Sequence, residues 1–300
     1  MAFKTVSSFS IVILMIALIF VQHVIAQREL EPSDVLELQP DGYAYADYPG
    51  VFDNANRDGI TIEAWIYLTD IPKDGHFTTR LAREGRWIIF AKPGSYAAFI
   101  RGRNLDSRGD MLELHGTTYL QFAQSPQPTA NNRGDGGVFV PIPIEDYPLK
   151  RWVHIAYALR QEEHRVVGLL FFDRKPLGLG EMRDPMGRTP APFVIGGTPA
   201  IRFKEGSQWG HQYTSMRGYI DGVRVSKGLR YDIHGNIHPK RRFSADARTI
   251  ALWHFAEGPG APSYADASGN GYTLAAGGSL SVHPRDKVAT TWGTIKRGTF

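Results

Sequence analysis

The sequence predicts an all-β fold, an antiparallel β-sandwich of the jelly-roll type. After the first apolar segment the chain shows almost no helical periodicity. Short segments instead alternate between apolar and polar residues, and clusters of Gly, Pro, Asn and Asp separate them. Many short strands joined by turns and long loops are typical of sandwiches and jelly rolls.

The segment ITIEAWIYL at residues 60–68 is the clearest predicted strand. Its residues alternate with a period of two, and the second face is partly aromatic. One face is expected to hold Ile60, Ile62, Ala64, Ile66 and Leu68, and the other Thr61, Glu63, Trp65 and Tyr67.

Other alternating or apolar segments predict the remaining strands. The stretch HRVVGLLFFDRKPLG is expected to form a hairpin whose turn is Asp173-Arg174-Lys175. In chain order, the further strands are predicted at residues 86–91, 96–102, 111–116, 151–160, 165–173, 193–197, 218–226 and 249–258.

Residues 1–26 are predicted to be a signal peptide. A lysine near the start precedes an apolar run at residues 11–21, and the segment ends in Val24-Ile25-Ala26, which suits signal peptidase. We expect cleavage after Ala26. An uncleaved membrane anchor is the alternative, but the run is well short of the roughly 20 residues that a spanning helix needs. The protein is therefore expected to be secreted or held at the cell surface or in the periplasm, without stable membrane insertion after cleavage.

Residues 27–280 are predicted to form one domain, and residues 281–300 a C-terminal tail or a last strand. The chain of 300 residues has no cysteine, which excludes disulfides, thiolate metal sites and a cysteine nucleophile. The net charge is +4, and the basic residues are scattered among acidic ones. The densest basic cluster, residues 240–242, is interpreted as a solvated loop, so we expect no nucleic-acid partner.

Five segments carry a resemblance to a known family. They are ITIEAWIYL, RWVHIAYAL, FVIGG, GYIDGVRVSKGLRY, and ALWHFAEG with DASGNGYTL, and together they span residues 35–276. Their order and spacing resemble the bacterial LamG-like jelly-roll domains, relatives of laminin G and pentraxins in the concanavalin A-like lectin and glucanase superfamily. The resemblance implies two curved antiparallel sheets, often with a calcium ion at one edge. Many relatives bind glycans or other extracellular polymers, and a few are enzymes.

The stretch DASGNG has two interpretations. As a tight turn, it uses Asp266 and Asn270 to bond nearby backbone groups, while Gly269 and Gly271 tolerate positive φ. As a metal site, it offers the oxygen atoms of Asp266 and Asn270 to calcium, although its spacing is not that of an EF-hand loop.

Asp221 is a second candidate calcium ligand. In YIDGVRV it is expected to share one face with Tyr219, Val223 and Val225, where an unpaired carboxylate would be costly. Its partner could be an arginine, backbone N–H groups or a cation. Asp41, together with Asp47, could converge on the same sheet edge.

Catalytic motifs are absent or incomplete in the sequence. No E-x-D-x-x-E, G-x-S-x-G or H-E-x-x-H pattern occurs, and Gly235 and Pro239 argue against a helix that would align His234 and His238 for zinc. Two Arg-Gly-Asp tripeptides are interpreted as chance. A carbohydrate-active hydrolase would have to use an unrecognised acid pair among Glu63, Glu145 and Glu257.

Aromatic residues in loops indicate the binding surface. Trp209, His211 and Tyr213 lie in a long loop with Arg202 nearby, and Tyr119 is added from another loop. The alternative is that Trp209 covers the edge of the core. We expect an exported, non-catalytic binding module for a glycan or other extracellular polymer, with calcium as an optional aid. A hydrolase and a structural or adhesion surface protein are the alternatives.

Overall fold

The computed structural model describes residues 34–40, 42–48, 50–53, 58–72, 86–92, 95–105, 109–117, 137–142, 146–163, 166–182, 191–197, 214–232, 234 and 237–278. The chain divides into Met1–Ser33 and Asp34–Phe300, and all the described residues belong to the second unit. Within these ranges, no helix has the length and apolar character needed to cross a membrane. The strands are β1 (Leu36–Leu38), β2 (Tyr43–Ala46), β3 (Ile60–Leu68), β4 (Arg86–Lys92), β5 (Tyr96–Leu105), β6 (Gly109–Thr117), β7 (Gly137–Ile142), β8 (Trp152–Gln161), β9 (Val166–Phe172), β10 (Lys175–Met182), β11 (Phe193–Ile195), β12 (Thr214–Ser215), β13 (Gly218–Lys227), β14 (Thr249–Trp253), β15 (Ser263–Tyr264) and β16 (Leu274–Gly277).

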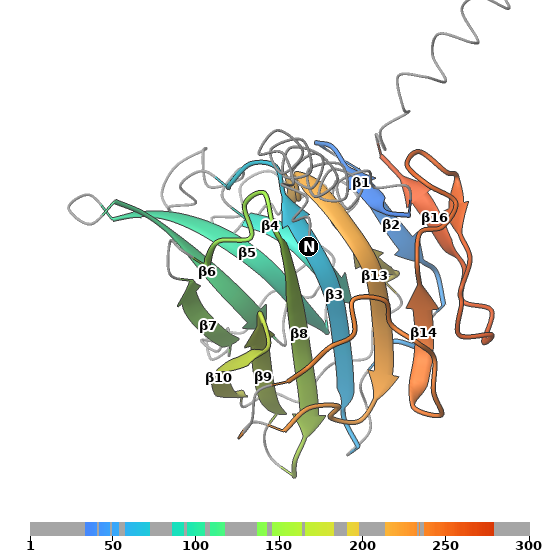
Figure 1. Ribbon diagram of the computed structural model, residues 1–300. Helices are drawn as coiled ribbons and strands as arrows, with labels where there is room; N and C mark the ends of the chain where they lie inside the picture. The colour runs from blue at the N-terminus through green and yellow to red at the C-terminus, as the bar shows by residue number, and fades with distance from the viewer. Residues whose placement is uncertain are drawn as a thin grey trace, which may run out of the picture. The chain divides into compact units, whose positions relative to one another are not determined.

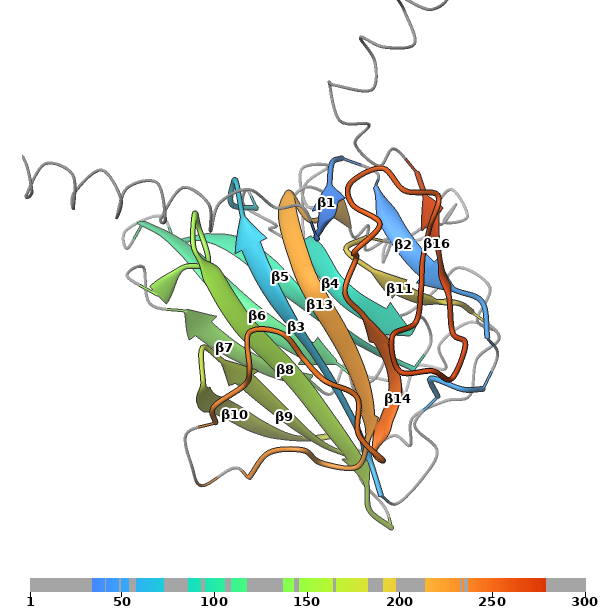
Figure 2. The same cartoon turned by 45° about the vertical axis from the view of Figure 1, so that its right-hand side comes forward.

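The strands form two sheets that pack face to face around one apolar core (Figures 1 and 2). The first sheet has the order β1-β13-β3-β8-β9-β10, with β14 paired to β13. The second has the order β15-β16-β2-β11-β4-β5-β6-β7, with β12 paired to β4. The chain crosses repeatedly between them: β3 lies in the first sheet, β4 to β7 in the second, β8 to β10 in the first again. This arrangement confirms the predicted antiparallel β-sandwich of the jelly-roll type.

Strand β3 lies in the middle of the first sheet and confirms the expected alternation. It pairs with β13 on one side and with β8 on the other. Its apolar residues from Ile60 to Leu68 enter the core between the sheets. Its other face, which begins with Thr61 and Glu63, is the outer face of the first sheet, and most of that face is also buried.

Strand β14 is shorter than the sequence predicts. It ends at Trp253, and the chain turns at Phe255, whose φ is 56° although its ring is buried. The ring therefore reaches the core from a turn and not from a continued strand. Very short strands such as β12 and β15 were not predicted, because two residues cannot display a period.

Strand β13 corrects the expected placement of Asp221. The pairing with β3 shifts register between Asp221 and Val223, and Gly222 has a φ of 72°. This extra residue inverts the alternation, as a β-bulge does. Ile220 and Val223 therefore both enter the core, while Asp221 pairs with Trp65 on the outer face. Tyr219 and Asp221 do share the outer face, but the prediction that Val223 and Val225 lie on the same face was wrong for this reason.

The predicted hairpin is present, with a turn of two residues. Asp173 and Arg174 have φ of 45° and 74°, and Lys175 already begins β10. Two consecutive left-handed residues form a turn whose twist matches that of the strands. The Asp173 carboxylate is held by Arg151 at 2.9 Å, whereas the Arg174 side chain is exposed.

Arg174→Gly is expected to raise the free energy of unfolding by about 0.5 to 1 kcal/mol. Relief of left-handed strain is worth about 1–2 kcal/mol, which exceeds the added entropy of glycine in the unfolded chain, about 0.4–1 kcal/mol. Urea denaturation measures the difference. Lys175→Gly is the control and should destabilise, because Lys175 lies in a regular strand. A stability loss for Arg174→Gly would contradict this account of the turn.

Candidate functional site

The outer face of the first sheet is covered by the chain between β13 and β14. We call the described residues of 228–248 the covering segment; Figures 1 and 2 show it in orange, in front of β8 and β9. Tyr231 and Ile237 pack against an apolar patch of β8 and β9 that includes Phe171. Phe243 packs on Trp65. These contacts remove most of the outer face from water.

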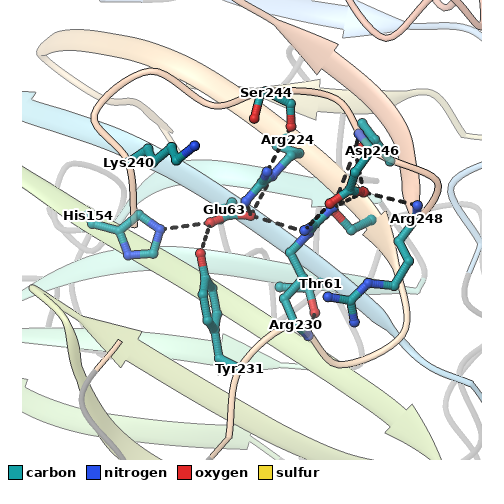
Figure 3. Close-up of polar contacts among 12 residues, drawn as sticks. Thr61, Glu63, His154, Arg224, Arg230, Tyr231, Lys240, Ser244, Asp246 and Arg248 are labelled. Atoms are coloured by element: carbon teal, nitrogen blue, oxygen red, sulfur yellow. Dashed lines mark hydrogen bonds and ion pairs between the residues drawn. The ribbon is translucent and has the colours of Figure 1, made fainter. Parts of the chain in front are cut away.

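A buried polar cluster around Glu63 lies beneath the covering segment (Figure 3). Arg224 donates to Glu63 Oε1 through Nε at 2.8 Å, and its Nη2 lies 2.7 Å from the same atom. His154 Nε2 lies 3.0 Å from Oε2, and facing a carboxylate it must carry the hydrogen. Tyr231 of the covering segment donates its hydroxyl to Oε2. The side chains of Glu63 and His154 are fully buried.

Arg230 links this cluster to the end of the covering segment. Its Nη1 and Nη2 donate to the two carboxylate oxygens of Asp246 at 2.8 and 2.7 Å. Its Nε lies 3.7 Å from Glu63 Oε1. At the start of the segment, Thr61 donates its hydroxyl to Gly228 O at 2.7 Å. Near the end of the segment, Arg224 of β13 donates to Ser244 O at 3.0 Å, so polar contacts tie the covering segment to the sheet at both ends.

The charges of the cluster stabilise one another. Burial alone raises the pKa of Glu63, but the hydrogen bond and charge of His154, with Arg224 and Tyr231, hold it below its usual value. The hydrogen bonds from Arg230 hold the pKa of Asp246 well below its usual value. Burial and the Glu63 carboxylate raise the pKa of Tyr231. Both acids are therefore ionised at neutral pH, and Tyr231 remains a hydrogen-bond donor.

We call Glu63, His154, Arg224 and Tyr231 the clasp, because they hold the covering segment on the sheet. The Glu63 carboxylate is not exposed to solvent, and both of its oxygens have hydrogen-bond partners. A hydrolytic acid must reach the glycosidic bond of a substrate, which Glu63 does not do in this conformation. The exposed Glu257 accepts from the backbone N–H of Ala265 at 2.7 Å, and Glu145 lies outside the described residues. Within the described ranges, no three His, Asp or Glu side chains are placed to hold a metal ion together.

Asp221 has an arginine partner. Arg241 of the covering segment lies 2.7 Å from its carboxylate. The guanidinium carbon of Arg241 also lies 4.1 Å from the Trp152 ring centroid and 5.0 Å from that of Trp65, within the range of cation–π attraction. Burial raises the pKa of Asp221, and the charge of Arg241 opposes this effect. An arginine, one of the three partners that the sequence allowed, is thus in contact with Asp221, while calcium at this residue stays a prediction.

The DASGNG stretch forms the predicted turn. Asp266 Oδ1 accepts from the backbone N–H of Leu252 and Ser268 at 3.0 and 2.8 Å, and Oδ2 accepts from that of Tyr272 at 3.0 Å. Asn270 donates its amide to Ile250 O at 2.9 Å. Gly269 and Gly271 have φ of 85° and 82°. The hydrogen-bonding interpretation is confirmed, while calcium at these residues stays a prediction.

Three aromatic rings form a row across the outer face, beside the covering segment. Tyr219 of β13 pairs with Tyr67 of β3, and Tyr67 pairs with Trp152 of β8. The ring centroids are 5.8 and 5.4 Å apart, and each of the three residues is half-buried. We call these three residues the aromatic row. Sequence reasoning missed it as a site, although each ring lies at an outward position: Tyr219 and Trp152 at the starts of their strands and Tyr67 at the end of the antiparallel β3.

No protein-family model and no curated protein matches the chain. Solved structures resemble it, among them the following three. A proposed carbohydrate-binding protein from Bacteroides ovatus is 15% identical, with 83% of this chain and 60% of that chain covered and a TM-score of 0.47. A native heptameric SAP-like pentraxin from Limulus polyphemus is 13% identical, with 82% and 94% covered and a TM-score of 0.39. Domains LG4-5 of the mouse laminin alpha1 chain are 16% identical, with 69% and 44% covered and a TM-score of 0.35.

The described strands form an antiparallel β-sandwich of the jelly-roll type. The chain spans less than two thirds of the Bacteroides protein and of the laminin structure. On this jelly roll the exposed His234 and His238 lie outside any strand. The predicted ligand-binding residues Trp209, His211, Tyr213, Arg202 and Tyr119, and the candidate calcium ligand Asp41, lie outside the described residues.

Proposed function

We propose that this protein is an exported, non-catalytic binding module that holds a glycan or another extracellular polymer on the outer face of its first sheet. The aromatic row is the observation that supports this proposal. Large rings usually enter the core, so half-exposed rings placed side by side are informative. The row lies on three paired strands, which hold the rings in place without a partner. Neighbouring rings are tilted by 56°. Rings held in place in this way bind without much ordering cost.

The use of the acidic residues supports binding over hydrolysis. Glycoside hydrolysis on two carboxylates needs both of them beside the substrate. In the described part of the chain, Glu63 holds the clasp and Asp266 holds the turn. Asp221 pairs with Arg241. Each of these acids has a structural role that catalysis would disrupt.

Binding by the exported form of the chain, beginning at Gln27, tests the proposal. We expect this protein to be retained on an array of extracellular polysaccharides, while heat-denatured protein is not retained. A parallel array with a chelator tests the proposed aid from calcium: if calcium at Asp41, Asp221, Asp266 or Asn270 contributes, retention falls. Failure of the native protein to bind any polymer on either array would overturn the proposal.

The two alternative functions, hydrolase and structural or adhesion protein, would give different results with the same protein and polymers. A hydrolase would release new reducing ends from the retained polymer. A structural or adhesion protein would co-purify with an envelope polymer and show no preference among defined glycans. We expect neither result.

A further inference from the structure

We propose that the ligand is an uncharged glycan whose chain runs across β13, β3 and β8 along the aromatic row, with sugar rings on Tyr219 and Tyr67 and the next sugar beside Trp152, one face of which Arg241 covers. This inference rests on the proposed function and names the ligand class and the residues that bind it. It begins from the spacing of the rings. The centroids of Tyr219, Tyr67 and Trp152 succeed one another at 5.8 and 5.4 Å, close to the length of one pyranose unit in an extended chain.

The direction of the chain follows from the sheet. Strands in a sheet lie about 4.8 Å apart, so rings at paired positions repeat at nearly the strand spacing. Tyr219 pairs with Tyr67, which pairs with Trp152, so the row is perpendicular to the strands. A polymer that meets all three rings must therefore cross the strands. The apolar face of each sugar would contact a ring, because aromatic side chains combine a flat apolar body with polar edges.

Polar groups flank the row on both sides along the strands. Past the ends of β13 and β3, Arg217 and Asp70 form an ion pair at 3.0 Å, with side chains 43% and 50% exposed. On the other side, Arg241 and Asp221 form the pair at 2.7 Å, and the Arg241 side chain is 42% exposed. A carboxylate has about four acceptor sites and a guanidinium five donors. The Arg217–Asp70 pair, in which both side chains are exposed, therefore keeps hydrogen-bonding capacity for the hydroxyl groups of a sugar.

The charges of these groups select against a charged polymer. The two ion pairs contain one acid and one base each, so their net charge is zero. Burial, followed by the charge of Glu37, raises the pKa of Tyr219 above its ordinary value, so its hydroxyl adds no charge to this surface. An acidic glycan would meet the carboxylates of Glu37, Asp70 and Asp221. The two arginines of the 240–242 cluster, Arg241 and Arg242, are paired with Asp221 and Asp34. The surface thus fits hydroxyl groups and apolar ring faces, and not a polyanion.

Calorimetric titration tests the inference with soluble uncharged glucans, mannans and xylans, and with polyuronates of matched length. We expect an uncharged glycan to bind with an affinity that salt hardly changes, and the polyuronates to bind at least about tenfold more weakly. Tyr67→Ala should weaken binding at least about tenfold, as for an aromatic anchor. Tyr67→Phe keeps the ring and should stay close to the parent protein.

A second variant separates binding from folding. Asp70→Asn lies in an exposed ion pair, where little stability is expected. It should leave the melting temperature unchanged and still weaken binding several-fold. Binding of glycans that is unaffected by Tyr67→Ala and Asp70→Asn would overturn the proposed site and leave the function intact. If polyuronates bind more tightly than uncharged glycans, with an affinity that falls with salt, the proposed ligand class is wrong. The ligand class is also wrong if the protein self-associates and Tyr67→Ala abolishes that self-association. No binding by any polysaccharide would overturn the function itself.

Discussion

Glu63→Gln is expected to lower the free energy of unfolding by about 3–5 kcal/mol. The substitution keeps the size of the side chain but removes the negative charge that Arg224 contacts at 2.7 Å. The Arg224 side chain is only 11% exposed, so water cannot replace the lost partner. The amide also presents N–H donors to a cluster in which His154 and Tyr231 already donate. Equilibrium denaturation in urea measures the change.

A matched control uses the same substitution in an exposed pair. Arg160 and Glu162, at the end of β8, lie 2.5 Å apart with side chains 46% and 27% exposed. Glu162→Gln should change the stability by less than about 1 kcal/mol. Faster proteolysis within the covering segment should accompany Glu63→Gln alone, because the clasp holds that segment. A Glu63→Gln protein within about 1 kcal/mol of the parent would show that the cluster is not a clasp.

The same variant changes the response to acid. The pKa of Glu63 is lower in the folded protein than its ordinary value of 4.5. The ionised carboxylate therefore makes its full contribution to the free energy of unfolding above pH 4.5. This contribution is lost as the pH falls below 4.5 toward the folded-state pKa. The parent protein should therefore lose stability in that acid range, and Glu63→Gln should show a smaller loss there. Equal pH dependence of the two proteins would contradict an ionised Glu63.

Asp266→Ala is expected to lower the free energy of unfolding by about 3 kcal/mol. It removes the acceptor for three backbone N–H groups, those of Leu252, Ser268 and Tyr272. Each unsatisfied group costs about 1–3 kcal/mol, and the low end applies because the turn is partly exposed. Asp266→Asn keeps one oxygen, so its free energy of unfolding should lie between those of the parent protein and Asp266→Ala. Thermal denaturation with and without a chelator measures the effect.

The chelator distinguishes the two interpretations of this stretch. If Asp266 acts through its hydrogen bonds, the loss is the same with calcium and with chelator. A loss seen only when calcium is present would identify Asp266 as a calcium ligand, because ligand binding stabilises the folded state by mass action. We expect the first result.

The sequence determined the fold class through local patterns. The alternation from Ile60 to Leu68 predicted both the strand and its buried face, because side chains in a strand change sides at every residue. The turn at Asp266 was predicted from side chains that bond nearby backbone groups, as Asp266 does with Ser268 and Tyr272. The strand and these bonds depend on residues that are near one another in the chain, so the sequence is sufficient to predict them. The bonds of Asp266 with Leu252 and of Asn270 with Ile250 are less local, 14 and 20 residues apart.

Tertiary structure alone decided the partners of the charged groups. Glu63 meets His154, Arg224 and Tyr231, which are 91, 161 and 168 residues away in the chain, so no spacing could indicate the clasp. A single bulge at Gly222 moved Asp221 to the outer face, where it meets Arg241. The aromatic row likewise needed the register of three strands, because one residue of slip turns each ring to the other face. Sheet pairing, which is non-local, therefore decides which side chains form a surface.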